Sequence, residues 1–331
     1  MFGYIVRRVI SGLLVLLVVS IAVFALFFYG PADPALAYCP ETRCPPGRLE
    51  AIRTSLGLDR PVVQQYGEYM AGIFVGNDFK AGAISIRCDA PCLGVSFKLR
   101  ENVTEYLLGK FPATLSIALG AAVIFLTVGV SSGIFAARRR GSPADKGIVG
   151  ASLVINAMPY YLLALLAYLL LISKWGIFPE SGYYPLLQNG PWAWAKGLIL
   201  AWLVLGISSS TQYARFSRGS MIESMNEDYV RTARAKGLSE RRVTLKHALR
   251  SAMVPVVTIF GLEFAYLLAG TIFTERIFDI QGIGLTALQA IGTKDLPLIS
   301  ATVLIGAAFV VVANVFVDIV YSVIDPRVRL T

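Results

Sequence analysis

The sequence predicts an all-α membrane protein with six transmembrane helices. Hydrophobic residues make up 56% of the 331 residues, and the mean hydropathy is +0.64. Charged residues make up only 15% of the chain, against roughly a quarter in soluble domains. The apolar residues lie in runs of about 20, which is the length that a helix needs to cross a bilayer. Backbone polar groups must be satisfied inside lipid, so such runs indicate helices, whereas strands of an outer-membrane barrel would be shorter and alternating.

The spans are placed by these apolar runs and by the residues that end them. The six runs cover residues 9–28, 112–137, 147–172, 192–212, 254–273 and 298–324. The first is too long for a signal peptide, and no Ala-x-Ala-like cleavage site follows it, so we interpret it as a retained span. The second ends at Arg138, and the fourth is the weakest because its C-terminal end is rich in serine and threonine.

The distribution of positive charge predicts the orientation of the spans. Seventeen of the 30 Lys and Arg residues lie at the two termini and in the loops after the second and fourth runs. Only four lie in the two short loops on the opposite side. Cytoplasmic loops carry the excess of positive charge, so both termini are predicted inside a plasma (inner) membrane. Nine more lie in the long segment after the first run, but long segments cross almost regardless of charge.

The long outer segment, residues 29–111, is predicted to form a small, partly helical extracytoplasmic cap. Gly57 is expected to follow a helix over residues 48–56, and Pro61 is expected to begin a second helix that reaches about residue 74. The segment is too small and too closely tied to the membrane to be an independent enzyme domain.

All four cysteines, Cys39, Cys44, Cys88 and Cys92, lie in this outer segment. That distribution favours disulfides in an oxidising compartment, and four cysteines allow three pairings among which the sequence does not choose. An all-cysteine zinc site is the second alternative, but the spacings of four and three residues differ from the usual two. Free thiols are the third.

Several kinds of chemistry are excluded. The single histidine, His247, rules out histidine-rich metal sites, and no metal site or bound cofactor is predicted for this chain. There is no Walker A sequence to hold nucleotide phosphates. The net charge of +9 is explained by the cytoplasmic bias and by anionic lipids, and no nucleic-acid partner is predicted.

A basic block at residues 228–250 is the most ordered polar segment between two apolar runs. Asn226 is predicted as a helix N-cap, and Asp228 places negative charge in the first turn. Gly237 is expected to take the left-handed conformation after the helix. Ser239 is expected to cap a second helix that runs toward the fifth span.

Two interpretations of this block remain open. A basic loop at the membrane surface would bind lipid phosphates. The small residues Ala233 and Ala235 and the position of Gly237 favour instead the docking of another protein, because close contact between helices needs small side chains.

Residues 228–238 resemble the cytoplasmic signature loop of bacterial ABC importer permeases of the peptide/nickel (oligopeptide–dipeptide) family, and specifically its first, B-type subunit. Of the general importer pattern only the second alanine, the glycine and the leucine are kept. Further segments that resemble the family run from end to end: residues 4–8, 56–61, 111–115, 275–278 and 325–327. The cysteine-bearing stretch at 87–94 departs from it and resembles an insertion.

The resemblance implies a type I ABC importer permease fold with a small insert after the first helix. Residues 1–28 would hold the first span, residues 29–111 the cap, and residues 112–331 the other spans with a coupling loop at 214–250. It implies that this chain moves peptides by alternating access and is not itself an enzyme. The implied ATPase-coupling helix consists of Asp228, Tyr229, Val230, Arg231, Thr232, Ala233, Arg234, Ala235, Lys236, Gly237 and Leu238.

The partners that the resemblance implies are a second, related permease, two cytoplasmic ATPases that bind ATP and Mg, an extracytoplasmic peptide-binding protein, the peptide and membrane lipids. Dipeptides, longer peptides, nickel chelates and glutathione remain alternative substrates. A self-sufficient channel or secondary transporter would be expected to show inverted repeats, and a membrane-bound enzyme would need a convergent catalytic site. Neither feature is present in the sequence.

Polar residues within the spans are candidates for the translocation path. Ionisable groups are costly in lipid and by default face protein or water. Glu263 is expected near the ammonium end of a peptide, and Asn156 and Pro159 are expected to bend the third span and line the cavity. An internal contact for Glu263 and a plain bend at Pro159 are the alternatives. For Asp318 we favour an internal contact.

Overall fold

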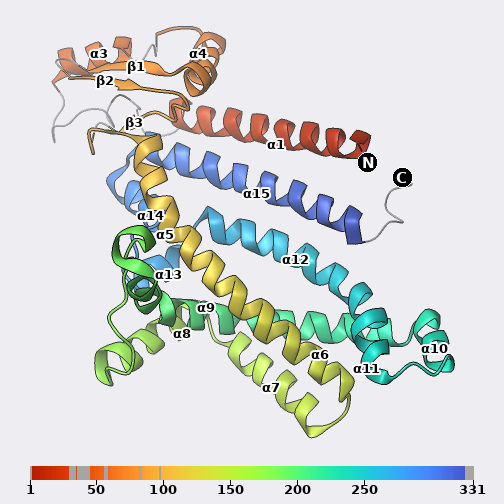
Figure 1. Cartoon of the computed structure of the whole chain (residues 1–331). Coiled ribbons are helices and arrows are strands. Elements are labelled where there is room, and N and C mark those ends of the chain that lie inside the picture. Colours follow the sequence, from red (N-terminus) through yellow and green to blue (C-terminus); the bar gives the residue numbers. More distant parts are fainter. Residues whose placement is uncertain are drawn as a thin grey trace.

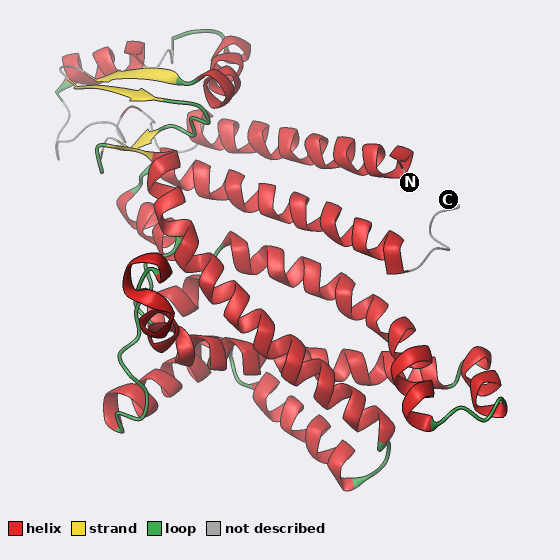
Figure 2. Ribbon diagram, in the orientation of Figure 1, coloured by secondary structure: helices red, strands yellow, loops and turns green. Residues whose placement is uncertain are grey.

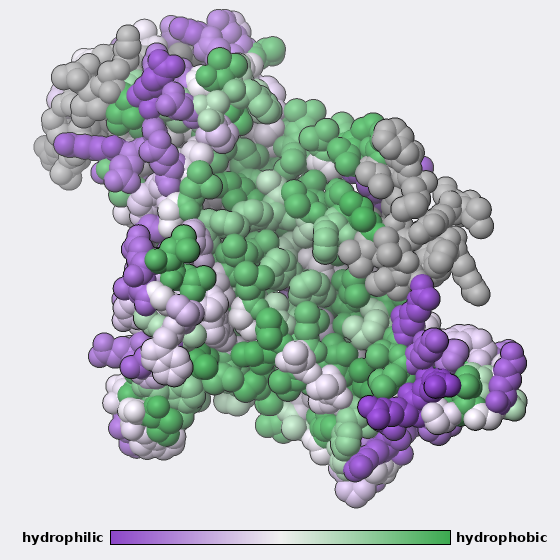
Figure 3. All heavy atoms as spheres, viewed as in Figure 1, coloured by the Kyte–Doolittle hydropathy of each residue, from purple (hydrophilic) through white to green (hydrophobic). Residues whose placement is uncertain are grey.

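The computed structural model describes residues 2–29, 35, 45–55, 59–81, 84–96 and 98–324. Helices dominate, as predicted, and the few strands gather at one end of the molecule (Figure 2). Hydrophilic residues concentrate over this end and over the opposite end near α10 and α11, and the surface between them is hydrophobic (Figure 3). This is the distribution expected of a protein that crosses a bilayer.

Within the described residues, five helices are long and apolar enough to cross a membrane, and a sixth crossing is a bent pair. The five are Val6–Leu26, Val103–Arg138, Leu186–Met225, Glu240–Ala269 and Leu296–Val317, and the pair is Pro143–Ala157 with Tyr160–Lys174. The prediction of six spans is confirmed if the pair counts as one.

Helix α1 (Phe2–Tyr29) packs along α15 (Leu296–Ile324), which in turn packs along α12 (Leu249–Ala269) (Figure 1). The hydrophobic core lies further inside and is centred on α5, α9 and α12, where Ile117, Phe125 and Leu198 are completely buried. The α1 helix therefore lies at the edge of the bundle, and its own side chains contribute little to the core.

The second span begins earlier than predicted. Helix α5 (Val103–Ile124) continues through a π-helical segment (Phe125–Val130) into α6 (Ser131–Arg138). Pro112 therefore lies inside the helix and does not begin it. The apolar run marks only where the helix enters lipid, and the helix itself extends beyond that point.

The fourth span is also longer than predicted. Helix α9 runs from Leu186 to Met225, with a single non-helical residue at Gly190. The serine- and threonine-rich end does not terminate it, because hydroxyls bond back to carbonyls of the same helix. Ser210 Oγ donates to the Ile207 carbonyl at 2.7 Å, and Thr211 Oγ1 donates to the Ser208 carbonyl at 2.8 Å.

The third span is broken. Helix α7 (Pro143–Ala157) and helix α8 (Tyr160–Ala167), which continues through a π-helical segment (Tyr168–Lys174), meet at an angle of 93°. Pro159, which has no N–H and restricts the residue before it, stands at the break. The bend expected at Asn156 and Pro159 is thus far sharper than a kink.

After α9 the chain forms α10 (Asp228–Ala235), α11 (Glu240–Arg242) and a π-helical segment (Val243–Ala248) that leads into α12. At the opposite end, α13 (Ile272–Ile277) and α14 (Ile283–Thr293) precede α15. Figure 1 shows α10 and α11 at one end of the bundle and α13 and α14 at the other.

The cap contains α3 (Pro46–Ser55), α4 (Val62–Val75), the hairpin β1 (Asn77–Ala81) with β2 (Ile84–Cys88), and the short pair β3 (Val95–Ser96) with β4 (Glu101–Asn102). The helix predicted from Pro61 is confirmed as α4, whereas the hairpin was not predicted. Cys88 forms a disulfide with Cys92. Cys39, Cys44, Gly57 and residues 325–327 lie outside the described residues.

Candidate functional site

The end of α10 is fixed by backbone hydrogen bonds around Gly237. The Gly237 N–H donates to the Arg234 carbonyl at 2.9 Å, and the Leu238 N–H donates to the Ala233 carbonyl at 3.4 Å. This pair of bonds is the Schellman arrangement, which needs a left-handed residue, and Gly237 has φ of +75°. The left-handed conformation predicted for Gly237 is confirmed. The N-cap residue is Glu227 and not Asn226, because Asn226 ends α9 with helical angles.

One face of α10 is built into the protein. Val230 is completely buried and Ala233 is 5% exposed. They belong to a cluster drawn from five elements, which consists of Ala137, Met221, Val230, Ala233, Val243, Ala248 and Ala252. Leu238 packs against the same cluster. The small residue at 233 therefore serves contact within this chain, and α10 is held against the π-helical segment Val243–Ala248 and the end of α9.

Arg234 holds α10 to the helix that follows it. Its Nε and Nη2 donate to the Glu240 carboxylate at 2.8 and 3.4 Å, and its Nη1 donates to the Met225 carbonyl at 3.4 Å. A bidentate guanidinium–carboxylate pair fixes the relative orientation of its two partners as well as their distance. Of the predicted coupling residues, Arg234 thus positions the helix and does not stand free.

The other face of α10 and its C-terminal turn are exposed. This face carries Asp228, Tyr229, Arg231, Thr232, Ala235, Lys236 and Gly237. Arg231 and Asp228 approach to 3.5 Å, but both remain largely in solvent. An aromatic side chain among flexible charges is typical of surfaces that bind another protein.

Helices α6 and α9 are in unusually close contact behind this element. Gly129, in the π-helical segment that leads into α6, and Gly133, in α6 itself, are four residues apart and face α9. A Cβ atom at Gly129 would lie 2.6 Å from Tyr213 Cβ and 2.8 Å from the Ser210 carbonyl oxygen. A Cβ at Gly133 would overlap Ser217 Oγ and the Ala214 carbonyl oxygen. Such small-xxx-small spacing lets membrane helices approach closely, so α6 and α9 form a rigid pair.

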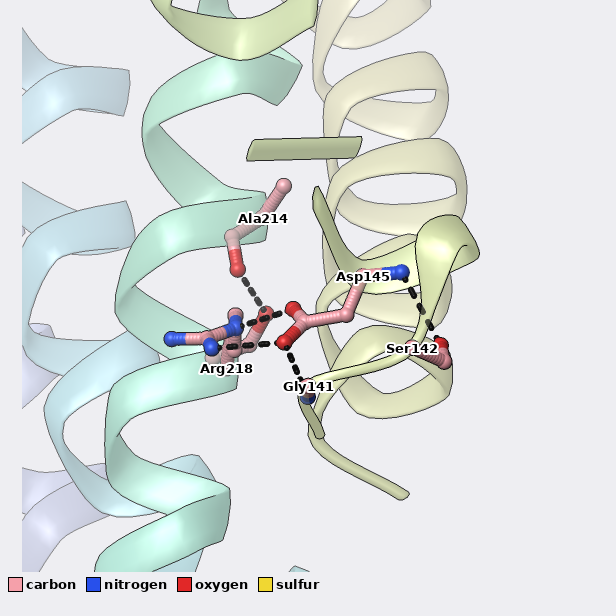
Figure 4. A network of polar contacts seen from close by, with 6 residues as sticks. Gly141, Ser142, Asp145, Ala214 and Arg218 are labelled. Atoms are coloured by element: carbon pink, nitrogen blue, oxygen red, sulfur yellow. Dashed lines mark hydrogen bonds and ion pairs between the residues drawn. The ribbon is translucent and has the colours of Figure 1, made fainter. Parts of the chain in front are cut away.

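A bidentate ion pair between Asp145 and Arg218 attaches α7 to α9 (Figure 4). Arg218 Nε and Nη2 donate to Asp145 Oδ1 and Oδ2 at 2.6 and 2.8 Å. Asp145 Oδ2 also accepts from the Gly141 N–H at 2.9 Å, and the Asp145 N–H donates to Ser142 Oγ. Asp145 is 3% exposed, whereas the Arg218 side chain is 28% exposed. The turn between α6 and α7 is thereby fastened to the end of α9.

This ion pair gives a testable expectation. Asp145→Asn removes the charge and one acceptor for the Arg218 fork, so we expect a lower melting temperature and weaker transport. Lys146→Gln, which changes an exposed neighbour, is the matched control. Thermal unfolding of the purified protein compares the melting temperatures of the two variants. A melting temperature of Asp145→Asn equal to that of Lys146→Gln would contradict the expectation.

The predicted path residues are not brought together as one site. Asn156 and Pro159 lie at the break between α7 and α8 and are both exposed. Glu263 lies on α12 and interacts electrostatically with Tyr213 of α9. Among the described residues, neither Glu263 Oε2 nor Tyr213 Oη has a hydrogen-bond partner, although both atoms are buried. The structure thus places Glu263 toward α9. The side chain of Asp318 lies outside the described part of the chain.

Glu275, at the opposite end, is completely buried and accepts three hydrogen bonds. Its donors are Thr114 Oγ1 at 2.8 Å, Thr271 Oγ1 at 3.3 Å and the Leu285 N–H at 2.6 Å. Burial raises the pKa of this carboxyl above its ordinary value, and the hydrogen bonds from Leu285 and Thr114 offset only part of that effect. Glu275 thus joins α13, α14 and α5.

Sequence reasoning did not find the Asp145–Arg218 pair. A local signal was present, because Ser142, Pro143 and Asp145 match the N-cap, first and third positions of a helix start. Nothing local, however, indicates that the partner of Asp145 lies 73 residues away. In the part of the chain that is described, no cluster of histidine, cysteine and acidic side chains is arranged to hold a metal ion.

Comparison with known families gives matches along almost the whole chain. Residues 129–330 match the family described as "Binding-protein-dependent transport system inner membrane component", and residues 1–118 match the N-terminal region described for such membrane components.

Similar proteins of known name include three transport permeases. A putative peptide transport system permease protein of Brucella abortus is 37% identical over 329 residues, covering 99% of each chain. A di/tripeptide transport system permease protein of Pseudomonas aeruginosa is 37% identical over 350 aligned positions, with 99% of each chain covered. The dipeptide transport system permease protein of Escherichia coli K12 is 33% identical over 351, again covering 99% of each chain.

Proposed function

The chain belongs to the family of binding-protein-dependent transport system inner membrane components, and we propose that α10 is the element through which partner ATPases drive it. The protein is a permease subunit of a peptide-importing ABC transporter, which the family match and the names of its relatives support. The finer proposals are the role of α10, the identity of the partners and the orientation in the membrane.

The observation that supports the role of α10 is its two-sided construction. Its inner face joins the cluster that includes Ala137, Met221 and Ala252, which belong to α6, α9 and α12. Its outer face presents Tyr229, Arg231 and Lys236 to solvent. A force applied to the outer face would therefore pass into the end of α9 and, through the π-helical segment Val243–Ala248, into α12. A loop that only bound lipid headgroups would not need such a rigid attachment.

In this mechanism ATP and Mg bind in two partner ATPases, and this chain holds neither. Closure of the ATPases displaces α10. The rigid α6–α9 pair and α7 move with it, so that the permease alternates between inward-open and outward-open states. A second, related permease completes the path, and a peptide-binding protein delivers the substrate on the cap side. The proposed orientation places both termini and α10 in the cytoplasm. A nickel chelate or glutathione is the alternative substrate.

A cross-linking experiment tests the assignment of α10. A photo-activated cross-linking residue at Tyr229 or Lys236 should capture an ATP-hydrolysing subunit in native membranes. The same cross-linking residue introduced in place of Glu223, which is exposed on α9, measures the background level of capture. Transport by the purified chain alone, without any ATPase, would overturn the proposal and favour a self-sufficient secondary transporter or channel.

Gly237→Val should uncouple transport from ATP hydrolysis. A β-branched residue resists the φ of +75° at this position, and disruption of the Schellman turn would displace the exposed end of α10. We expect at least a tenfold loss of ATP-driven uptake with normal membrane insertion. Gly219→Val is the control, because Gly219 has open space around its Cβ position and no positive φ. Unchanged uptake by Gly237→Val would count against the coupling role.

A further inference from the structure

Helix α4 of the cap is attached to a part of α1 that lies inside the membrane. Ser20 Oγ and Tyr66 Oη are hydrogen-bonded at 2.8 Å. The Phe24 ring packs against the Tyr66 and Tyr69 rings, with centroids 5.3 and 5.9 Å apart. Both α1 residues belong to the candidate span Val6–Leu26. The cap is therefore held at the membrane surface by side chains that reach into the span.

The depth of this contact can be estimated from helix geometry. The span has 21 residues, or about 30 Å at 1.5 Å per residue, which equals the hydrocarbon thickness. Ser20 precedes the end of the span, Leu26, by six residues, so it lies about 9 Å below the boundary. The Tyr66 side chain, which joins α4 to Ser20, is shorter than this depth of about 9 Å. The axis of α4 therefore lies close to the level where hydrocarbon meets headgroups.

Apart from Val75, which is 83% exposed at the last position of the helix, the residues of α4 divide into a polar and an apolar side. Gln64, Gln65 and Glu68 form the polar side, where Glu68 accepts hydrogen bonds from Gln64 at 3.2 Å and from Arg60 at 2.5 Å. Gln65 is buried and donates to the Arg60 carbonyl at 2.6 Å. These bonds secure the start of the helix, and Gln64 and Glu68 remain exposed.

The apolar side extends beyond the residues that contact α1. Tyr66 and Tyr69 occupy one half of it. Val63 and Phe74 occupy the other half, about 60–80° around the helix from Tyr66 at 100° per residue. These two side chains are 84% and 74% exposed, whereas Tyr66 and Tyr69 are partly buried. Large apolar side chains are thus left uncovered at the membrane surface.

This uncovered half continues a surface that already faces lipid. On α1 the side chains of Leu13 and Leu17 are 60% and 42% exposed, and only 17% of the most apolar window of this helix is buried. These leucines lie seven and three residues before Ser20, so they share the face of α1 that contacts α4. Because α4 rests on that helix, its exposed apolar half lies beside the same lipid-facing surface. We propose that α4 is an interfacial helix whose Val63 and Phe74 insert into the membrane leaflet on the cap side. Tyrosine at the same level is typical of membrane interfaces.

Depth measurements by spin labelling test this assignment. A nitroxide-bearing unnatural amino acid is placed at Val63 or Phe74 in the intact protein, reconstituted with its associated subunits in phosphatidylcholine–phosphatidylglycerol liposomes. Accessibility to oxygen, which concentrates in lipid, is compared with accessibility to a water-soluble nickel complex. Val18 on α1 gives the lipid reference. Gln64, on the polar side of the same helix, and Asp89, which is 79% exposed in the cap, give the aqueous reference.

Labels at Val63 and Phe74 are expected to behave as the label at Val18 does, with an oxygen-to-nickel accessibility ratio at least several-fold above that at Gln64. Ratios equal to those at Gln64 and Asp89 would show that α4 is in water and would overturn the inference. Protection from both reagents would show that another protein covers the helix, which would overturn it equally. Quenching of Phe74→Trp fluorescence by brominated lipid provides a second measurement without a bulky label.

Discussion

Gly133→Leu is expected to abolish the folded permease. A side chain at this position would overlap Ser217 Oγ and the Ala214 carbonyl oxygen, and it would lie 3.0 Å from the Arg218 nitrogen. Two of these three atoms belong to the backbone of α9 and cannot rotate away. The two helices must then separate, so the cost should exceed about 3 kcal/mol, beyond the usual range for overpacking. The measurements are the amount of monodisperse protein after detergent extraction and its melting temperature.

The matched control is Gly109→Leu. Gly109 lies in the same continuous helix, and nothing is within 4 Å of its Cβ position. This variant should be recovered at wild-type levels, since leucine also has a better helix propensity than glycine. Equal recovery and equal melting temperatures of the two variants would show that α6 and α9 do not touch as described.

Glu275→Ala is the second change with a large expected effect. It leaves Thr114, Thr271 and the Leu285 N–H without their common acceptor in a buried environment. Each unsatisfied donor costs about 1–3 kcal/mol, so three of them predict a total loss of about 3–9 kcal/mol. Glu105→Ala, at an exposed position of α5, should change stability little. The comparison is made by thermal unfolding, and similar melting temperatures would refute the role of Glu275.

Glu275→Gln separates charge from hydrogen bonding. The raised pKa of Glu275 means that the folded state binds this proton more tightly than the unfolded state does. The stabilising contribution of Glu275 to the free energy of unfolding is therefore fully present below the unfolded pKa of about 4.3. It falls as the pH rises through the folded pKa. Melting temperatures measured from pH 4 upward should show this decline in the wild type and a flatter profile in Glu275→Gln.

The class and order of the spans could be predicted from the sequence because hydrophobicity is a local property. Helix ends could not. Residues 103–111 and 213–225 are helical although they are polar or mixed, because helices continue through water once tertiary contacts support them. The hairpin of β1 and β2 was missed although Ile84–Cys88 alternates between apolar and polar residues, because five residues are a short signal. The break at Pro159 was detectable, but its angle depends on what α7 and α8 each pack against.

In the candidate site, Gly237 was predictable because only glycine readily takes a positive φ after a helix. The role of Ala233 was different from the one expected: it packs inside this chain and does not form the docking face. The buried networks of Asp145 and Glu275 depend on partners 73 and 161 residues distant in the sequence. Such pairings are set by the packing of whole helices, so no local motif identifies them.

The length of α9 has a mechanical consequence. From its break at Gly190 to Met225 the helix is about 50 Å long at 1.5 Å per residue, so about 20 Å of it projects beyond the hydrocarbon. The two ends of α9 therefore cannot both lie within the hydrocarbon. A tilt of about 10° about the break would carry its far tip roughly 9 Å sideways. In the proposed mechanism, a displacement of several ångströms at the α10 end would thus correspond to a rotation of α9 by only about 10°.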